Sequence, residues 1–205
     1  MTGAGRIASV RGTVSVMRVH VTGATGFLGA ELLRLAPRAT GERVEVRDRE
    51  AVIALFQSVR PDVVIHTAYG EMKADAEARV AAIAPDALLV RTSLIVGGPG
   101  HEPSKHEIVA RDPTATFYED EIRSPVQVGD LAAALLELAT LDVSGPLNVA
   151  GADDVSRAEL AELVAGSPVR RAAAPRGRPL DCSLDSARAR SLVRTELRGV
   201  RTVFA

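Results

Sequence analysis

Residues 17–29 read MRVHVTGATGFLG, and this stretch decides the fold class. Arg18 to Val21 reads as a short β-strand. A helix is predicted from Gly26 to about Leu35, because phenylalanine and leucine residues recur there at the spacing of one apolar face. A strand, a glycine-rich turn and a helix in immediate succession are typical of a βα unit in an α/β protein.

The turn between the strand and the helix has the pattern TGxxGxxG. Gly23 permits a tight turn, Gly26 lets the backbone approach a pyrophosphate at the helix N-terminus, and Gly29 allows the helix to pack closely on the strand. We therefore predict a dinucleotide-binding loop, and a glycine turn that binds nothing is the alternative. The residues assigned to this loop are Gly23, Ala24, Thr25, Gly26, Phe27, Leu28 and Gly29.

Strands and helices alternate along the rest of the chain. The runs Val63–Ile65 and Leu88–Val96 predict strands buried on both faces. Asp48 is expected to cap a helix from Arg49 to Val59, and Asp130 to cap another to about Thr140. Ser156 and Glu159 have the spacing of a capping box that opens a helix to Val164, and Asp185 or Ser186 is expected to start a last helix to about Arg194. A further helix is expected at 71–83, strands at 43–47, 116–118 and 147–149, and a loop at 167–179. This alternation predicts an α/β fold with a parallel sheet, which binds ligands beyond the carboxyl ends of its strands.

The composition is that of an ordinary globular protein. The chain has 205 residues, 46% of them hydrophobic and 25% charged, which suits one domain or one domain with a small appended lobe. A formal net charge of −1 and 3% aromatic residues argue against a nucleic-acid partner. No apolar run reaches the roughly 20 residues that span a bilayer, so we expect no membrane association.

Cysteine and histidine usage bounds the compartment and the metal chemistry. Cys182 is the only cysteine, so we expect no intramolecular disulfide and a cytoplasmic location. The i, i+5 spacing of His101 and His106 does not place both on one helix face, so we expect no metal site, even with Glu107 nearby.

Several segments resemble, in order, the motifs of the extended short-chain dehydrogenases/reductases. The glycine loop, Asp62–Ala68 (DVVIHTA) and Tyr69–Lys73 (YGEMK) are specific to that superfamily. Later segments are similar to its dTDP-4-dehydrorhamnose reductase branch, and they are residues 90–97, 123–131, 147–151 and 178–185. The resemblance implies a Rossmann-type doubly wound parallel sheet with a small C-terminal substrate lobe.

The resemblance also implies a reaction, namely hydride transfer from NADPH or NADH to the ketone of a nucleotide-linked 4-keto sugar. Tyr69 would be the proton donor, because a phenol can protonate the oxygen of the ketone as it gains charge. Lys73 lies four residues later, on the same face of a helix, and its ammonium group would assist the tyrosine electrostatically. An ordinary surface tyrosine and lysine are the alternative.

Other site residues follow from the resemblance alone. Asp48 lies in the segment that contacts the adenosine portion of the cofactor, and helix capping is its alternative role. Thr67 and Ala68 would lie against the dinucleotide and Thr92 near the nicotinamide, with strand packing as the alternative. Arg123 would bind the nucleotide-sugar substrate, and a solvated surface arginine is the alternative.

Two segments of the family pattern have no counterpart in this sequence. Ala68 runs directly into Tyr69, where the family has a further helix and a strand that carries a Ser or Thr for the carbonyl oxygen. Pro37 to Glu42 is too short for the second strand, which carries the residue that distinguishes NAD from NADP. Three explanations stay open: segments are left out of the sequence, the chain is a catalytically impaired dinucleotide-binding or regulatory relative, or the YxxxK spacing is accidental.

We expect three regions. Residues 1–16 form an N-terminal extension, with Met17 as the natural start, and an extra edge strand is the alternative. Residues 17–98 form the NAD(P)-binding domain. Residues 99–205 form the substrate-binding lobe, from which 126–150 packs back on the first domain. A homodimer is left open.

Overall fold

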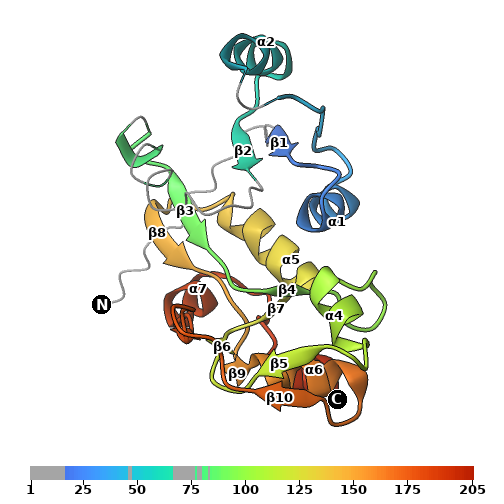
Figure 1. Cartoon of the computed structure of the whole chain (residues 1–205). Helices are drawn as coiled ribbons and strands as arrows, with labels where there is room; N and C mark the ends of the chain where they lie inside the picture. Colours follow the sequence, from blue (N-terminus) through green and yellow to red (C-terminus); the bar gives the residue numbers. More distant parts are fainter. Residues whose placement is uncertain (1–16, 46–47, 67–76, 78–79, 83) are drawn as a thin grey trace, which may run out of the picture.

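The structure is a computed structural model that describes residues 17–45, 48–66, 77, 80–82 and 84–205. Helices and strands alternate along it, which confirms the predicted α/β class (Figure 1). The helices are α1 (Phe27–Leu35), α2 (Arg49–Val59), α4 (Lys105–Ala110), α5 (Val128–Leu138), α6 (Arg157–Ala165), α7 (Ala187–Leu192) and α8 (Val200–Val203). The strands are β1 (Val19–Thr22), β2 (Val63–His66), β3 (Leu88–Arg91), β4 (Ile95–Val96), β5 (Thr116–Tyr118), β6 (Ile122–Arg123), β7 (Val126–Gln127), β8 (Gly145–Asn148), β9 (Val155–Ser156), β10 (Arg170–Ala172) and β11 (Asp181–Cys182). None of the helices in the described ranges has the length and apolar character needed to cross a membrane.

Strand β1 has a parallel neighbour on each edge. β2 pairs with it in a register that runs from Val19 opposite Val63 to Thr22 opposite His66. On the other edge, the Val21 N–H donates to the Thr40 carbonyl at 2.8 Å, and the Thr40 N–H donates to the Val19 carbonyl at 2.9 Å. A one-residue bridge at Thr40 therefore occupies the place of the second strand that the sequence is too short to form.

The strand expected at 43–47 is wrong for residues 43–45, which are irregular, and residues 46–47 lie outside the described ranges. The run at Val63–Ile65 does form a strand, but only one of its faces is well covered. Val63 and Ile65 pack on the cluster around β1 and α1, whereas Val64 is 40% exposed. Side chains alternate along a strand, so Val63 and Ile65 turn toward the cluster while Val64 turns away from it.

The run Leu88–Val96 forms two short strands instead of one. β3 pairs in parallel with β8, and β4 pairs in parallel with β7, with residues 92–94 between them. The continuous strand predicted there is wrong because the two halves of the run pair with different segments of the chain.

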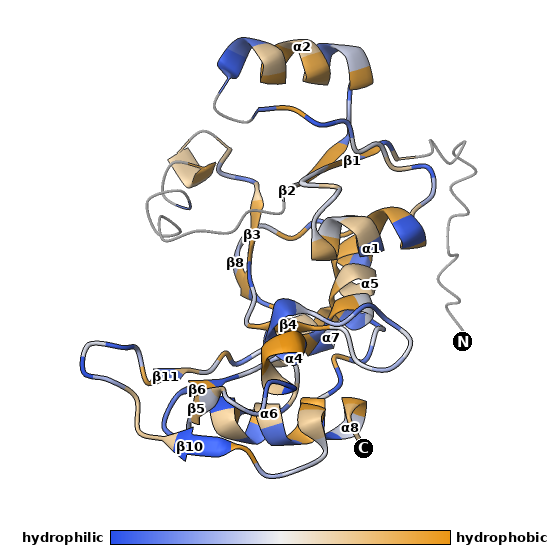
Figure 2. Cartoon of the chain, turned by 45° about the vertical axis from the view of Figure 1, so that its right-hand side comes forward, coloured by the Kyte–Doolittle hydropathy of each residue, from blue (hydrophilic) through white to orange (hydrophobic). Residues whose placement is uncertain are grey.

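The C-terminal part contains two further sheets. β5 pairs in parallel with β10, and β6 lies between parallel β11 and antiparallel β9. β10 falls within the stretch 167–179 that we expected to be a loop. It is the strongly hydrophilic strand in Figure 2, and it pairs with β5 at Arg170 and Arg171 through backbone groups. Its charged side chains do not show the apolar pattern by which a strand is predicted from sequence.

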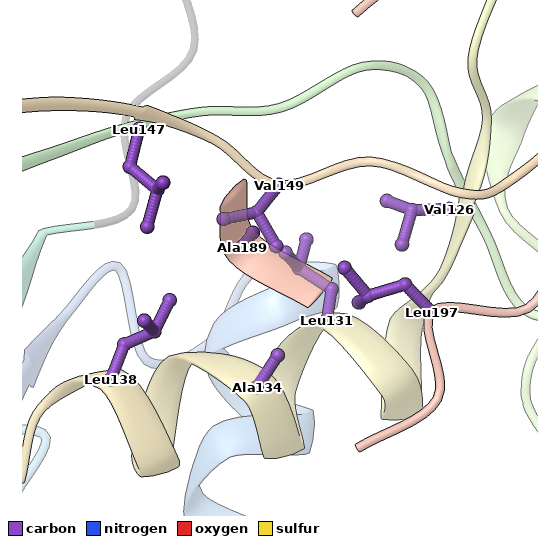
Figure 3. Close-up of a cluster of buried hydrophobic side chains, with 8 residues drawn as sticks. All are labelled: Val126, Leu131, Ala134, Leu138, Leu147, Val149, Ala189 and Leu197. Carbon is purple, nitrogen blue, oxygen red and sulfur yellow. The ribbon is translucent and has the colours of Figure 1, made fainter. Parts of the chain in front are cut away.

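Helix α5 contributes to two apolar clusters. Figure 3 shows one of them, in which Leu131, Ala134 and Leu138 of α5 meet side chains of β8 and α7. Ala132 of the same helix belongs to the second cluster, around β1 and α1. Leu28 of α1 packs against both clusters, so α1 and α5 join the glycine-loop end of the molecule to the rest.

Helix starts follow local capping chemistry. Asp48 Oδ1 accepts the N–H groups of Glu50 and Ala51, each at 3.0 Å, as expected for the cap of α2. The cap predicted at Asp130 is wrong, because α5 begins at Val128 and the Gln127 side chain accepts the Asp130 N–H at 2.8 Å. The Asp130 carboxylate instead forms an ion pair with Arg198 at 2.8 Å.

Candidate functional site

The glycine loop connects the buried strand β1 to helix α1 as a closed turn. Gly23 has a φ of 70°, a conformation that favours glycine, and its carbonyl accepts the Gly26 N–H at 2.9 Å. A Cβ on Gly29 would lie 2.2 Å from the Gly23 carbonyl oxygen and 2.8 Å from the Ala24 Cα. The helix and the loop therefore touch through backbone atoms. We predicted that Gly29 would let the helix pack closely on the strand, and the close contact lies instead at the loop that follows β1.

The N-terminus of α1 is suited to bind an anion. Gly26 is its N-cap, no side chain in the described part of the chain caps it, and its first turn carries no acidic residue. Gly23, Thr25 and Gly26 are exposed, so the turn before α1 is open to solvent. Side chains of Asp48, Ser104, Gln127 and Ser156 cap α2, α4, α5 and α6, whereas the short helices α7 and α8, like α1, have no side-chain cap. Unsatisfied N–H groups and the helix dipole both favour a phosphate at such a terminus, so these residues fit the pyrophosphate of a dinucleotide.

The residues proposed for the reaction itself follow β2 in the sequence. Thr67, Ala68, Tyr69 and Lys73 all fall outside the described residues. The structure therefore does not test the direct step from Ala68 to Tyr69.

Thr92 follows directly after β3 and is half-buried. Its Oγ1 is buried and has no hydrogen-bond partner within the ranges that the structure describes. A buried hydroxyl without a partner is uncommon, because leaving its hydrogen bond unmade costs about 1–3 kcal/mol.

Asp48 and Arg123 are both engaged in structural contacts. The Asp48 carboxylate caps α2, as described above. The Arg123 guanidinium donates to the carbonyls of Ile122 at 2.6 Å, Leu180 at 3.0 Å and Pro179 at 3.1 Å. It thereby fastens the segment before β11 to β6. Figure 1 places β6 in the lower part of the molecule, away from the glycine loop at the junction of β1 and α1.

A polar cluster that sequence reasoning missed holds α1 against the rest of the chain. The Gln127 amide nitrogen donates to the Gly97 carbonyl at 2.8 Å and lies 3.1 Å from His101 Nδ1. Since that amide group donates, Nδ1 must accept, which leaves the His101 Nε2–H to donate to the Glu31 carboxylate of α1 at 3.3 Å. The Arg34 guanidinium, followed by His101, holds the pKa of the buried Glu31 below its ordinary value against the effect of burial.

A second missed feature shapes the loop after β4. Glu107 is almost fully buried, and its carboxylate accepts the N–H groups of Gly97 at 2.7 Å, Gly98 at 3.0 Å and Ser104 at 2.7 Å. Burial raises the pKa of Glu107, but these backbone donors outweigh it and hold the pKa below the ordinary value. The sequence did contain a signal for this element, because Ser104 and Glu107 have the S-x-x-E spacing of a capping box.

Comparisons with known proteins agree with this arrangement. A family model described as the RmlD substrate binding domain matches residues 67–201. A dTDP-4-dehydrorhamnose reductase of Mycolicibacterium smegmatis is 34% identical over 110 residues, which are 50% of this chain and 34% of that protein. The chain spans about a third of the length of the curated relatives it matches.

Solved structures share the fold. A hypothetical dTDP-4-dehydrorhamnose reductase from Sulfolobus tokodaii has a TM-score of 0.70 and 24% identity, covering 89% of this chain and 97% of that one. A dTDP-4-dehydrorhamnose reductase from Bacillus anthracis, in complex with NADP, has a TM-score of 0.70 and 17% identity, covering 92% and 96%. This likeness confirms the predicted Rossmann-type architecture. Since the family model matches well over half of the residues, the chain belongs to the RmlD substrate binding domain family.

Proposed function

We propose that this protein is an NAD(P)H-dependent reductase that acts on a nucleotide-linked 4-keto sugar. The observation that carries the proposal is the exposed, uncapped N-terminus of α1, built on closely packed glycines at the end of β1. Family membership and the dTDP-4-dehydrorhamnose reductases among the similar proteins support the choice of substrate class.

Each site residue has a role in this proposal. The amides from Gly23 to Gly29 hold the pyrophosphate of the bound NADPH or NADH, which supplies the hydride. Tyr69 gives a proton to the oxygen of the ketone as that oxygen gains charge, and the Lys73 ammonium stabilises the phenolate that remains. Thr67, Ala68 and the free hydroxyl of Thr92 lie along the dinucleotide. Asp48 lies near its adenosine end, and Arg123 near the diphosphate of the sugar nucleotide.

We further assign residues 17–98 to dinucleotide binding and 99–205 to substrate binding, with residues 126–150 packed back on the first region. The contacts of α5 with α1 and the pairing of β8 with β3 support this division.

One observation favours a second candidate, a dinucleotide-binding protein without reductase activity. Within the described ranges, the ladder of β1 and β2 shares no strand with the ladder of β3 and β8. The sequence between those ladders is where the family's Ser- or Thr-bearing strand has no counterpart. A chain without that strand would bind the cofactor and lack part of the catalytic constellation.

Turnover distinguishes the two candidates. The purified protein is mixed with NADPH or NADH and a dTDP-4-keto sugar, and consumption of the reduced cofactor is followed by its near-ultraviolet absorbance. Tyr69→Phe should abolish consumption, while Tyr118→Phe, at the only other tyrosine, should leave it unchanged. Full activity in Tyr69→Phe would remove the role of Tyr69, and cofactor binding without turnover in the unaltered protein would favour the second candidate.

A further inference from the structure

Within the described residues, a single polar side-chain contact joins α1 to another element. Glu31 and Arg34 carry the polar side chains of this helix, and the Arg34 guanidinium donates to the Glu31 carboxylate at 2.8 and 2.6 Å. The same carboxylate, which is almost fully buried, accepts the Nε2–H of His101 at 3.3 Å. The other contacts of α1 with its neighbours are apolar, and apolar attraction has no direction. The bond to His101 therefore fixes the helix in a way that apolar packing alone does not.

His101 is itself held from its other side. Gln127 is buried, its Oε1 accepts the Asp130 N–H at 2.8 Å, and its Nε2 donates to the Gly97 carbonyl at 2.8 Å. These two backbone partners allow the amide group only one orientation. Its Nε2 also lies 3.1 Å from His101 Nδ1, so the ring accepts there and carries its proton on Nε2.

Gly129 leaves room for this chain of hydrogen bonds. A Cβ on Gly129, in the first turn of α5, would lie 3.0 Å from Gln127 Oε1 and 3.2 Å from His101 Nε2. It would also lie 3.4 Å from Glu31 Oε1. Side chains from α1, from the turn after β4 and from the start of α5 thus meet at one point, where only a glycine leaves them space.

We propose that His101 is a positioning residue for dinucleotide binding, which in its neutral form fastens α1 to α5 and so holds the N-terminus of α1 in the place that receives the pyrophosphate. The inference rests on the proposed function, because it concerns the helix whose amides hold that pyrophosphate. Gly26, the N-cap of α1, precedes Glu31 by roughly one and a half turns, so a displacement at Glu31 moves the amides as well.

A proton on Nδ1 of His101 would break the contact with Gln127. Two donors would then face each other, and the Gln127 amide group cannot turn without losing its bonds to Gly97 and Asp130. The bond to Glu31 persists, because Nε2–H donates in both states and the added charge attracts the carboxylate. Protonation therefore leaves the ring attached to α1 and releases it from α5.

Charged groups on the neighbouring elements act in both directions. On α1, the Glu31 carboxylate favours protonation of the ring and the Arg34 guanidinium opposes it. On α5, the Asp130 carboxylate is paired with Arg198. After the turn, the Glu107 carboxylate is held by backbone N–H groups of that turn. Among these charged groups, Glu31 is the one in direct contact with the ring, and its bond survives protonation, so the contact with α5 is the one that responds to pH.

The test is calorimetry of NADH and NADPH binding to the full chain, without substrate, at about pH 7.5 and about pH 5.5, within the range where histidine changes its charge. The affinity of the unaltered protein should fall by about twofold to tenfold at the lower pH, the factor that one ordinary hydrogen bond contributes. His101→Gln should bind equally well at the higher pH and lose less at the lower, because a glutamine can accept from Gln127 and donate to Glu31 without titrating. His101→Leu can do neither and should bind weakly at both pH values.

His106→Gln is the matched control, because it replaces a half-buried histidine five residues later and should keep the pH dependence in full. Comparing each variant with the unaltered protein at the same pH cancels the titration of the nucleotide itself. A long-range proton–nitrogen correlation spectrum, recorded without nucleotide, should show the ring proton of His101 on Nε2 at the higher pH.

The assignment would be overturned by an affinity that falls with pH in His101→Gln as it does in the unaltered protein, by undiminished affinity in His101→Leu, or by a ring proton on Nδ1. Weak binding of His101→Gln at both pH values would also overturn it, since the shape of the ring would then matter and its hydrogen bonds would not. Failure of both nucleotides to bind at the higher pH would instead remove the proposed function, and this inference with it.

Discussion

At the scale of single residues, two of the glycines that have no room for a Cβ lie against Ala24 of the loop. Gly29 brings the first turn of α1 against the backbone of the loop, and Gly41 brings the next segment against the Ala24 side chain. The loop is therefore enclosed on two sides by backbone that cannot recede without moving α1 or the bridge at Thr40. This close packing keeps the amides of the loop in place before any ligand arrives.

Gly29→Ala tests this packing. Its Cβ would collide with the Gly23 carbonyl at 2.2 Å, and an overpacked site of this kind loses about 1–3 kcal/mol of stability. This loss should exceed the gain of up to about 1 kcal/mol that alanine brings to a helix. Urea denaturation measures the change in stability, and calorimetry should show weaker dinucleotide binding.

Ala30→Gly is the matched control, because it makes the reverse exchange one position further along the same helix. It should lower stability by about 0.5–1 kcal/mol and leave dinucleotide affinity unchanged. If Gly29→Ala were as stable as the unaltered protein, the close contact between α1 and the loop would be disproved.

At the scale of elements, the packing of α4 on α6 contains a titratable group. His106 of α4 is half-buried, and its Nδ1 lies 3.5 Å from the Arg157 guanidinium of α6. Burial lowers the pKa of His106 to about 4, and the positive charges of Arg157 and Lys105 act in the same direction. The folded protein therefore holds this histidine neutral well below the pH at which it would become charged in the unfolded chain.

The stability of the protein should consequently fall as the pH falls from 6.5 to about 4. In this window the unfolded chain binds a proton at His106 that the folded chain does not, which favours unfolding. His106→Gln should reduce the loss, as measured by the urea midpoint across that pH range. Ile108→Gln, on the exposed side of the same helix, should retain the loss in full. A pH profile that is the same in His106→Gln and the unaltered protein would contradict this account.

At the scale of the whole molecule, α5 connects the glycine-loop end to the C-terminal part. One side of α5 lies in the cluster that Figure 3 shows, and Ala132 lies in the cluster of β1 and α1. Leu131 is fully buried in the first cluster, and α1 packs directly on α5. We therefore expect the two ends to unfold together, since neither keeps its core without this helix.

Leu131→Ala should lower the free energy of unfolding by about 2–5 kcal/mol, as large-to-small changes in a core do. Amide hydrogen exchange should accelerate both in β1 and in α7, because both ends depend on α5. Leu180→Ala, at a leucine that is 47% exposed, should change stability by no more than about 0.5 kcal/mol. Faster exchange in α7 alone would show that the two ends are independent.

The predictions from sequence succeeded where a few neighbouring residues suffice. Asp48 and Ser156 cap helices as expected, because a cap needs only its own side chain and the N–H groups two or three residues later. The turn at Gly23 and a close contact of the helix at Gly29 were also predicted, since three glycines at this spacing specify the turn locally. The same reasoning placed Asp130 at a helix start and missed that α5 begins at Val128, with the side chain of Gln127 as its cap.

Candidate site residues divide in the same way. The glycine loop was found from its own spacing, whereas the contact between His101 and Glu31 was overlooked because these residues are 70 positions apart in the chain. The strand β10 was overlooked because its arginines face outward while its backbone pairs with β5.

The chain's own residues thus settled the α/β class, the glycine loop and most helix starts, because turns and caps are formed within a few positions. The contacts between distant segments settled the rest: which strands pair, which face of β2 is covered, and which side chains hold α1 against the rest of the chain. These depend on the free energy of packing segments that are far apart in the chain, and no local pattern carries that information.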